Sequence, residues 1–209
     1  ITTEAPACPP PTTITPDILF YLQQKLLLII SDTITTGKLK HIIERAAMTI
    51  SVGDMLPNHT LTRFSTNGLE NSKLHEIIPS GLSIIFGVPG AYSRTCSKKH
   101  LPSFIRTMPK FKEIGVNKVV CISVNDPFVM ANWGIDSGAV DAGIEMFCDP
   151  TSTFISEIGL NFNAAPIGFF NRSKRFSMIV EDKKVKVLNV DEDSGTCDLS
   201  AGETIHALL

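Results

Sequence analysis

The sequence contains no pair of cysteines separated by only two residues, and this absence narrows the chemistry of its thiols. Dithiol oxidoreductases of the thioredoxin type and zinc ribbons both use such pairs, so neither class fits. The five cysteines are spread widely over the 209 residues, at Cys8, Cys96, Cys121, Cys148 and Cys197. An odd, widely spaced set suits a reducing compartment with one or two reactive thiols better than a secreted disulfide framework.

The chain also lacks an excess of charge and lacks an apolar stretch long enough to span a membrane. Its 19 basic and 21 acidic residues leave a net charge of −2, which gives no reason to expect nucleic acid as a partner. Residues 17–30 are apolar but are interrupted by Gln23, Gln24 and Lys25. A bilayer requires about 20 predominantly apolar residues, so we expect no stable membrane insertion.

Residues 1–48 are expected to be an N-terminal leader, disordered or weakly helical. Pro9, Pro10 and Pro11 lie in a Pro- and Thr-rich segment, which favours extended chain over helix. Residues 17–30 could form one helix, and no secretory signal is evident. Two interpretations stay open: a mobile leader of unknown role, and the remnant of an organelle presequence.

Residues 49–209 are expected to form one folded domain, because apolar strand-like segments alternate with helix-like segments. Strands are predicted at residues 59–64, 82–88, 117–124, 144–148, 175–180 and 185–190. Helices are predicted at residues 74–78, 96–114, 126–133, 151–158 and 201–209, with Pro102 and Pro109 expected to bend or shorten the second of them. This order predicts an α/β, thioredoxin-like fold in which helices flank both faces of a mixed central β-sheet.

Cys96 occupies a position that favours a reactive thiol. A strand ends at Val88, a loop containing Pro89 and Gly90 follows, and a helix is predicted to begin at Cys96. Free backbone N–H groups and the helix dipole favour an anion there, and the thiolate is the nucleophilic form of cysteine. The alternative is a buried, inert cysteine.

Pro89, Ser93 and Cys96 have the spacing P-x-x-x-[TS]-x-x-C, which resembles the signature of the peroxiredoxins. Further segments resemble the atypical two-cysteine, or type-five, subfamily: residues 86–91, 96–102, 123–126, 132–134 and 174–178. Several motifs in the family's order over roughly residues 50–209 make the resemblance specific. Arg94 and Thr95 depart from it, because relatives often have Pro and a small residue there.

The resemblance implies a thiol peroxidase that reduces hydrogen peroxide, alkyl hydroperoxides and peroxynitrite. Cys96 would be the peroxidatic thiol, Ser93 and Arg175 would hold the peroxide oxygens, and Pro89 would shield the sulfur. Cys197 would then capture the sulfenic acid in an intramolecular disulfide, which thioredoxin would reduce. No metal or organic cofactor is implied.

Each of these roles has an alternative when the residue is taken alone. Ser93 could be a helix cap, and Arg175 could be a surface charge like Arg172 and Lys174. Cys197 could be a bystander, which would make the protein a one-cysteine peroxidase. The rival function is a redox-responsive binding protein or chaperone in which oxidation of the reactive thiol changes association.

The sequence says less about the roles of the remaining cysteines and of one histidine. Cys121 lies in the middle of a predicted strand and is expected in the core, whereas Cys8 and Cys148 have no assigned role. His100 follows Cys96 by four residues, but two ligands do not make a zinc site, so we expect a surface or capping histidine.

The resemblance leaves open a mitochondrial, cytoplasmic or peroxisomal location, and a monomer or a homodimer.

Overall fold

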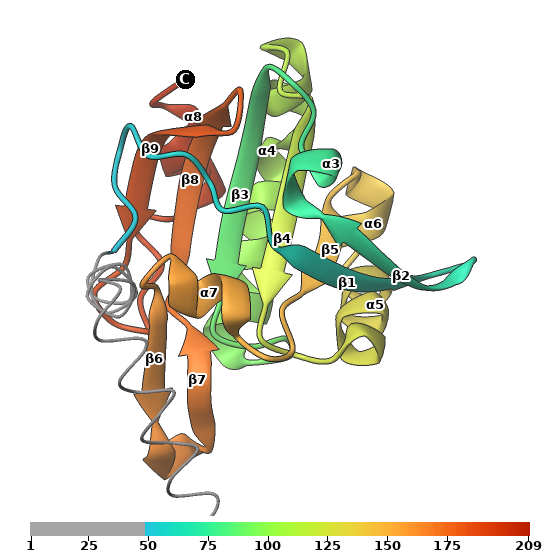
Figure 1. Cartoon of the computed structure of the whole chain (residues 1–209), viewed down its shortest axis with the longest axis vertical. Coiled ribbons are helices and arrows are strands. Elements are labelled where there is room, and N and C mark those ends of the chain that lie inside the picture. The colour runs from blue at the N-terminus through green and yellow to red at the C-terminus, as the bar shows by residue number, and fades with distance from the viewer. Residues whose placement is uncertain (1–48) are drawn as a thin grey trace, which may run out of the picture. The chain divides into compact units, whose positions relative to one another are not determined.

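The computed structural model describes residues 49–209, and the expectations for residues 1–48, including Cys8, lie outside this range. The main feature is a seven-stranded β-sheet in the order β2-β1-β5-β4-β3-β8-β9 (Figure 1). Its strands are β1 Thr60–Ser65, β2 Gly68–Lys73, β3 Leu82–Val88, β4 Lys118–Ser123, β5 Glu145–Cys148, β8 Phe176–Glu181 and β9 Lys184–Val190. The β3–β4 and β4–β5 pairs are parallel and the other pairs are antiparallel, so the predicted mixed sheet is confirmed.

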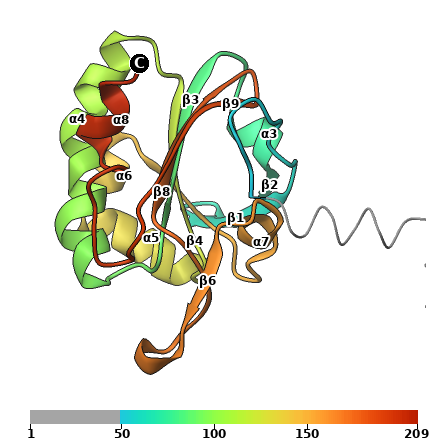
Figure 2. The same cartoon turned by 90° about the vertical axis from the view of Figure 1, so that its left-hand side faces the viewer.

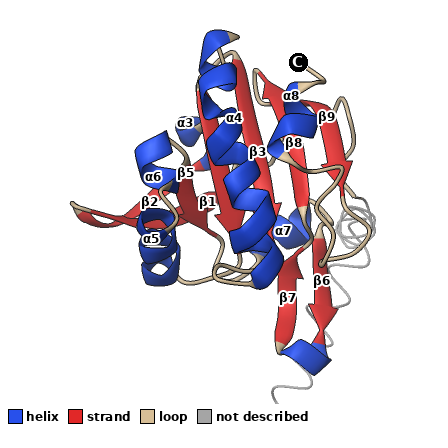
Figure 3. Cartoon of the chain, turned by 180° about the vertical axis from the view of Figure 1, so that it is seen from behind, coloured by secondary structure: helices blue, strands red, loops and turns tan. Residues whose placement is uncertain are grey.

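Helices cover both faces of the sheet, as the edge-on view shows (Figure 2). One face carries α4 Leu101–Glu113, α5 Pro127–Asp136, α6 Ala139–Ala142 and α8 Gly202–His206, which lie in front of the sheet in Figure 3. The other face carries the short helices α3 Leu74–Ile77 and α7 Thr153–Glu157. No helix within residues 49–209 combines the length and the apolar character that crossing a membrane requires.

The central strands are apolar along their length because both of their faces are buried. In β3, Ile85 belongs to the apolar cluster on the α3 and α7 side. Its neighbours Ile84 and Phe86 belong to the cluster on the α4 and α8 side, as the alternation of side chains along a strand requires. The strand is therefore held firmly in place up to Val88, where the loop that leads to Cys96 begins.

The helix predicted for residues 96–114 has an unusual first part. After Arg94 and Thr95 it passes through a π-helical turn, η1 Cys96–His100, in which the amide of Leu101 donates to the carbonyl of Cys96. A wider turn leaves room for the ring of Pro102, which lies in the first turn of α4 and has no N–H to donate. A bend or a shortening was expected at Pro109; the helix continues past it to Glu113, so shortening is wrong at this position.

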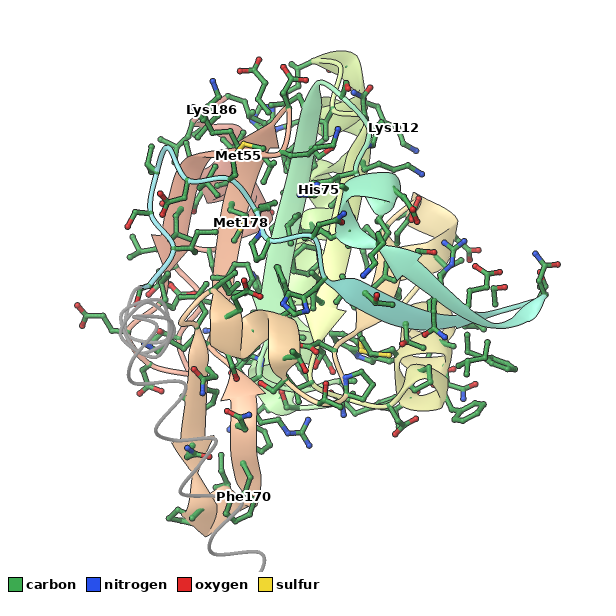
Figure 4. All side chains as sticks on the ribbon, in the orientation of Figure 1. Met55, His75, Lys112, Phe170, Met178 and Lys186 are labelled. Carbon is green, nitrogen blue, oxygen red and sulfur yellow. The ribbon has the colours of Figure 1, made fainter. Side chains whose placement is uncertain are left out.

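A two-stranded hairpin was not predicted from the sequence. Strands β6 Asn161–Ala164 and β7 Phe169–Ser173 pair with an irregular register and are joined by the 3-10 turn η2 Ala165–Ile167. The hairpin projects from the sheet, with Phe170 near its far end (Figures 1 and 4). Its strands are short and its alternation of apolar side chains is broken, so the pattern that normally indicates a strand is weak there.

Candidate active site

Cys96 lies in the first turn of a helix that follows β3. The strand ends at Val88, helical backbone begins at Arg94, and Cys96 is completely buried. The first amides of a helix have no acceptor within the helix, and the dipole adds partial positive charge at that end. The predicted strand–loop–helix setting of this thiol is therefore confirmed.

The loop between β3 and this helix is fixed from the carboxyl end of the neighbouring strand, β4. The side-chain oxygen of Asn125 accepts from the amide of Ala91 at 3.0 Å and from the hydroxyl of Ser123 at 2.7 Å. The Ser123 hydroxyl also lies 3.3 Å from the carbonyl of Val88. Because strand and loop share these contacts, the backbone that presents Cys96 has a defined position.

The positively charged side chain of Arg175, which is distant from Cys96 in the sequence, contacts the Cys96 sulfur. It lies between β7 and β8, is only 1% exposed, and its Nη1 lies 3.4 Å from Cys96 Sγ. A guanidinium at this distance favours negative charge on sulfur. Its Nη2 donates to the carbonyl of Ser194 at 2.7 Å, and its Nε has no acceptor among residues 49–209.

Pro89 and Ser93 lie in the loop before Cys96, as the sequence spacing requires. Pro89 is buried and Ser93 is partly buried. The carbonyl of Ser93 accepts from the amide of Ser97 at 2.9 Å, which closes the first turn of the helix. Its hydroxyl makes no hydrogen bond within the described part of the chain, so the side-chain cap considered from the sequence is not found.

Cys197 lies in the connection between β9 and α8 and is partly buried, with a free thiol like that of Cys96. Two hydrogen bonds hold this connection near Cys96: Arg175 to Ser194, and the Thr95 hydroxyl to the carbonyl of Gly195 at 3.0 Å. Burial raises the pKa of Cys197 to about 11, although the charge of Arg175 acts in the opposite direction. At neutral pH this residue is therefore a thiol.

The other two described cysteines, Cys121 and Cys148, lie in strands of the central sheet. Cys121 is fully buried in β4, as predicted, and burial raises the pKa of its thiol well above the ordinary value. Cys148 donates to the carbonyl of Thr62 at 3.0 Å, and burial raises its pKa to about 12. Both environments favour the protonated, unreactive form.

The expectation that His100 is a surface or capping residue is wrong, because its side chain is completely buried. The ring packs against Phe86 and Phe104, with centroid distances of 5.3 and 5.4 Å. Its Nε2 lies 2.9 Å from the carbonyl of Ser200. The π-helical turn carries His100 to the inner face of the helix, which the sequence spacing alone did not reveal.

Several residues that organise the site were not identified as such from the sequence. Trp133 donates from Nε1 to the hydroxyl of Ser97 at 3.1 Å and so fixes the turn after Cys96. Asn125 lies two residues after the end of the buried strand β4, and a polar residue close to the end of a parallel strand is a sequence signal for a site residue. Thr95 and Ser194 act through contacts between distant parts of the chain, for which the sequence holds no local signal.

The sequence profile of the redoxin family matches residues 51–205 of this chain. Peroxiredoxin-2B of Arabidopsis thaliana is 36% identical over 160 residues, which cover 76% of this chain and 98% of that relative. The mitochondrial peroxiredoxin-2F of the same plant is 38% identical over 144 residues, which cover 69% of each chain.

Solved peroxiredoxin structures share the fold. Reduced Prx3 of Vibrio vulnificus, in complex with hydrogen peroxide, superposes with a TM-score of 0.70 at 34% identity, covering 77% of this chain and 99% of that one. Peroxiredoxin 5 of Alvinella pompejana gives a TM-score of 0.65 at 28% identity, covering 76% and 96%. The predicted thioredoxin-like fold is confirmed, and the chain belongs to the redoxin family as a peroxiredoxin.

Proposed function

We propose that this peroxiredoxin reduces hydroperoxides through the thiolate of Cys96. The observation that carries the proposal is the guanidinium of Arg175, 3.4 Å from a sulfur that lies in the first turn of a helix. Cation and helix amides both favour the thiolate, the form that attacks peroxide oxygen. No metal or organic cofactor takes part in this chemistry.

The first step is a displacement on oxygen. The Cys96 thiolate attacks one peroxide oxygen, the O–O bond breaks, and the leaving oxygen takes up a proton, so that thiolate, ROOH and H⁺ give sulfenic acid and ROH. Arg175, the Cys96 amide and the Ser93 hydroxyl would hold the oxygens; Arg175 lies 3.4 Å from the sulfur, and Ser93 lies three residues before Cys96 in the same loop. Pro89, buried in the same loop, would keep bulk water from the sulfur.

The second step uses Cys197, as in the type-five subfamily. The Cys96 sulfenic acid and the Cys197 thiol form a disulfide and release water. The tether from Arg175 to Ser194 supports this role, because it places the connection that carries Cys197 beside the guanidinium that contacts Cys96. Thioredoxin, or a protein of the same dithiol chemistry, would supply two electrons to reopen the disulfide.

The substrate and location are proposed from the relatives. The Vibrio vulnificus protein was crystallised with hydrogen peroxide, which supports hydrogen peroxide as a substrate of this chain and, by the same chemistry, alkyl hydroperoxides and peroxynitrite. One relative is named mitochondrial and another, from rice, is named chloroplastic. These names favour an organelle, and among the locations expected from the sequence we propose the mitochondrion.

The test is intact mass measurement under non-reducing conditions after one equivalent of hydrogen peroxide. We expect the loss of two hydrogens, located by peptide mapping to a disulfide between Cys96 and Cys197. The Cys197→Ser variant should reduce one equivalent of peroxide and then stop, because thioredoxin finds no disulfide to reduce. Unimpaired turnover of that variant, a lone sulfenic acid in the wild type, or a disulfide to Cys121 would contradict the proposed second step.

Stopped-flow measurement of the first step tests the function itself. The rate constant of Cys96 with hydrogen peroxide should far exceed that of free cysteine at neutral pH. A rate equal to that of free cysteine would contradict peroxidase function and favour a redox-responsive binding protein.

A further inference from the structure

The connection between β9 and α8, residues 191–201, is here called the Cys197 loop. Its two ends are buried although it contains no strand or helix: Asp191 is 5% exposed and Ser200 is not exposed. Buried polar groups need hydrogen-bond partners, so the contacts of these two residues show what fixes the loop.

A chain of hydrogen bonds runs from His100 through Ser200 to Asp191. The Nε2 of His100 lies 2.9 Å from the carbonyl of Ser200 and 3.1 Å from its hydroxyl oxygen. Because a carbonyl only accepts, Nε2 carries the hydrogen. The Ser200 hydroxyl donates in turn to Asp191 Oδ2, while Oδ1 accepts from the amides of Asp198 and Leu199 at 3.2 and 2.9 Å.

His100 is a fixed, neutral donor in this chain. Burial lowers the pKa of His100 to about 3, and the nearby charge of Arg175 acts in the same direction. Its Nδ1 has no partner among the described residues, so a second proton on the ring would have no acceptor. The imidazole therefore holds one end of the loop throughout the physiological pH range.

Three side chains around Cys96 attach to the Cys197 loop, and the side chains of Asn189 and Thr204 attach to it as well. Thr95 directly precedes Cys96 and binds Gly195, His100 follows Cys96 on the same helix and binds Ser200, and Arg175 contacts the Cys96 sulfur and binds Ser194. No hydrogen bond joins the sulfurs of Cys96 and Cys197 within residues 49–209, and both thiols are free. A disulfide requires the two sulfurs at about 2.05 Å, so the sulfurs must approach each other while these attachments restrain the loop.

We propose that His100 is a positioning residue that, through Ser200 and Asp191, holds the Cys197 loop against the Cys96 helix and so sets the rate of disulfide formation. This inference rests on the proposed resolving role of Cys197. If the loop sets this rate, it also determines which of two reactions consumes the sulfenic acid. Cys96–SOH and the Cys197 thiol give the disulfide and water, whereas Cys96–SOH and a second ROOH give the sulfinic acid and ROH. A firmly held loop slows the first reaction and exposes Cys96 to the second.

The experiment compares His100→Phe with His100→Gln in the full chain. Phe keeps an aromatic ring against Phe86 and Phe104 but removes the donor, whereas the amide of Gln keeps a donor near the position of Nε2. Stopped-flow fluorescence would measure sulfenic acid formation and disulfide formation separately. We expect the Phe variant to form sulfenic acid at the wild-type rate and the disulfide about tenfold faster, and to require more peroxide for sulfinic acid formation. The Gln variant should stay within about threefold of the wild type.

Thr95 supplies a second test that does not disturb the core. Thr95→Val removes the donor to Gly195 and keeps the shape of the side chain, and Thr95→Ser keeps the donor. Loss of one hydrogen bond corresponds to about a fivefold shift toward the released loop. We therefore expect disulfide formation about fivefold faster in the Val variant and close to wild type in the Ser variant.

The outcomes separate this inference from the proposed function. Unchanged or slower disulfide formation in both His100→Phe and Thr95→Val overturns the inference and leaves the peroxidase chemistry intact. A wild-type protein that forms no Cys96–Cys197 disulfide overturns the resolving role of Cys197. In that case, hydrogen exchange of residues 192–199 still tests the attachment: faster exchange in His100→Phe supports it, and unchanged exchange overturns it.

Discussion

Cys96 and Cys121 are both fully buried, carry free thiols and belong to the same apolar cluster, yet their surroundings differ. Cys121 lies in the middle of β4, between β3 and β5, where burial raises the pKa of its thiol. Cys96 lies in the first turn of a helix with the guanidinium of Arg175 beside it. We infer that the charges and free amides inside a buried space, and not burial alone, determine the reactivity of a thiol.

The largest expected effect tests this comparison directly. Cys96→Ser should lower peroxide consumption at least about 1,000-fold, because the nucleophile is lost. Cys121→Ser should stay within about threefold, because a serine of similar size replaces a thiol without a catalytic role. Peroxide consumption coupled to a reductant measures both. A comparable loss in Cys121→Ser would show that the two thiols act together.

The second prediction concerns a variant that lacks the positive charge of Arg175 but keeps the Cys96 sulfur. Arg175→Gln should slow sulfenic acid formation about 100-fold, since the thiolate and the leaving oxygen both lose a charged donor. Arg172→Gln is the matched control, because Arg172 donates to the carbonyl of Val124 at 2.7 Å and lies over the ring of Phe169. We expect less than about threefold from the control. Equal losses in a stopped-flow assay would mean that general positive charge matters and not the contact at 3.4 Å.

The smallest expected effect concerns Ser93. Its hydroxyl makes no hydrogen bond within residues 49–209, so it is free to bind an incoming oxygen. Ser93→Ala should lower kcat/KM about tenfold, and Ser93→Thr should restore it, because threonine keeps the hydroxyl. If the Ala variant loses nothing, the peroxide is held by Arg175 and the helix amides alone.

The parts of this molecule that could be predicted from sequence are those fixed by local pattern. The strand Leu82–Val88 was predicted with its observed bounds because a mainly apolar segment with β-branched residues lies between clear turn signals. The place of Cys96 followed from the same pattern, because strand, loop and helix are consecutive in the chain. Arg175 was picked out by the resemblance alone, since an arginine at a strand start carries no signal of its own.

The remaining features depend on contacts between distant segments or on irregular backbone. His100 was expected at the surface, but the π-helical turn rotates it into the core. The contact between Thr95 and Gly195 joins residues separated by 100 positions, which no local periodicity encodes. The β6–β7 hairpin was missed because its four- and five-residue strands contain a register irregularity.

The π-helical turn has a consequence for how the helix that carries Cys96 tolerates a change in length. One residue in an α-helix corresponds to about 100° of rotation about its axis. The extra residue accommodated between Cys96 and His100 therefore sets the angular offset between the sulfur and the apolar stripe that anchors α4 to the sheet. A one-residue deletion in this turn would leave α4 seated but swing the sulfur away from the guanidinium, so a well-folded yet inert protein would result.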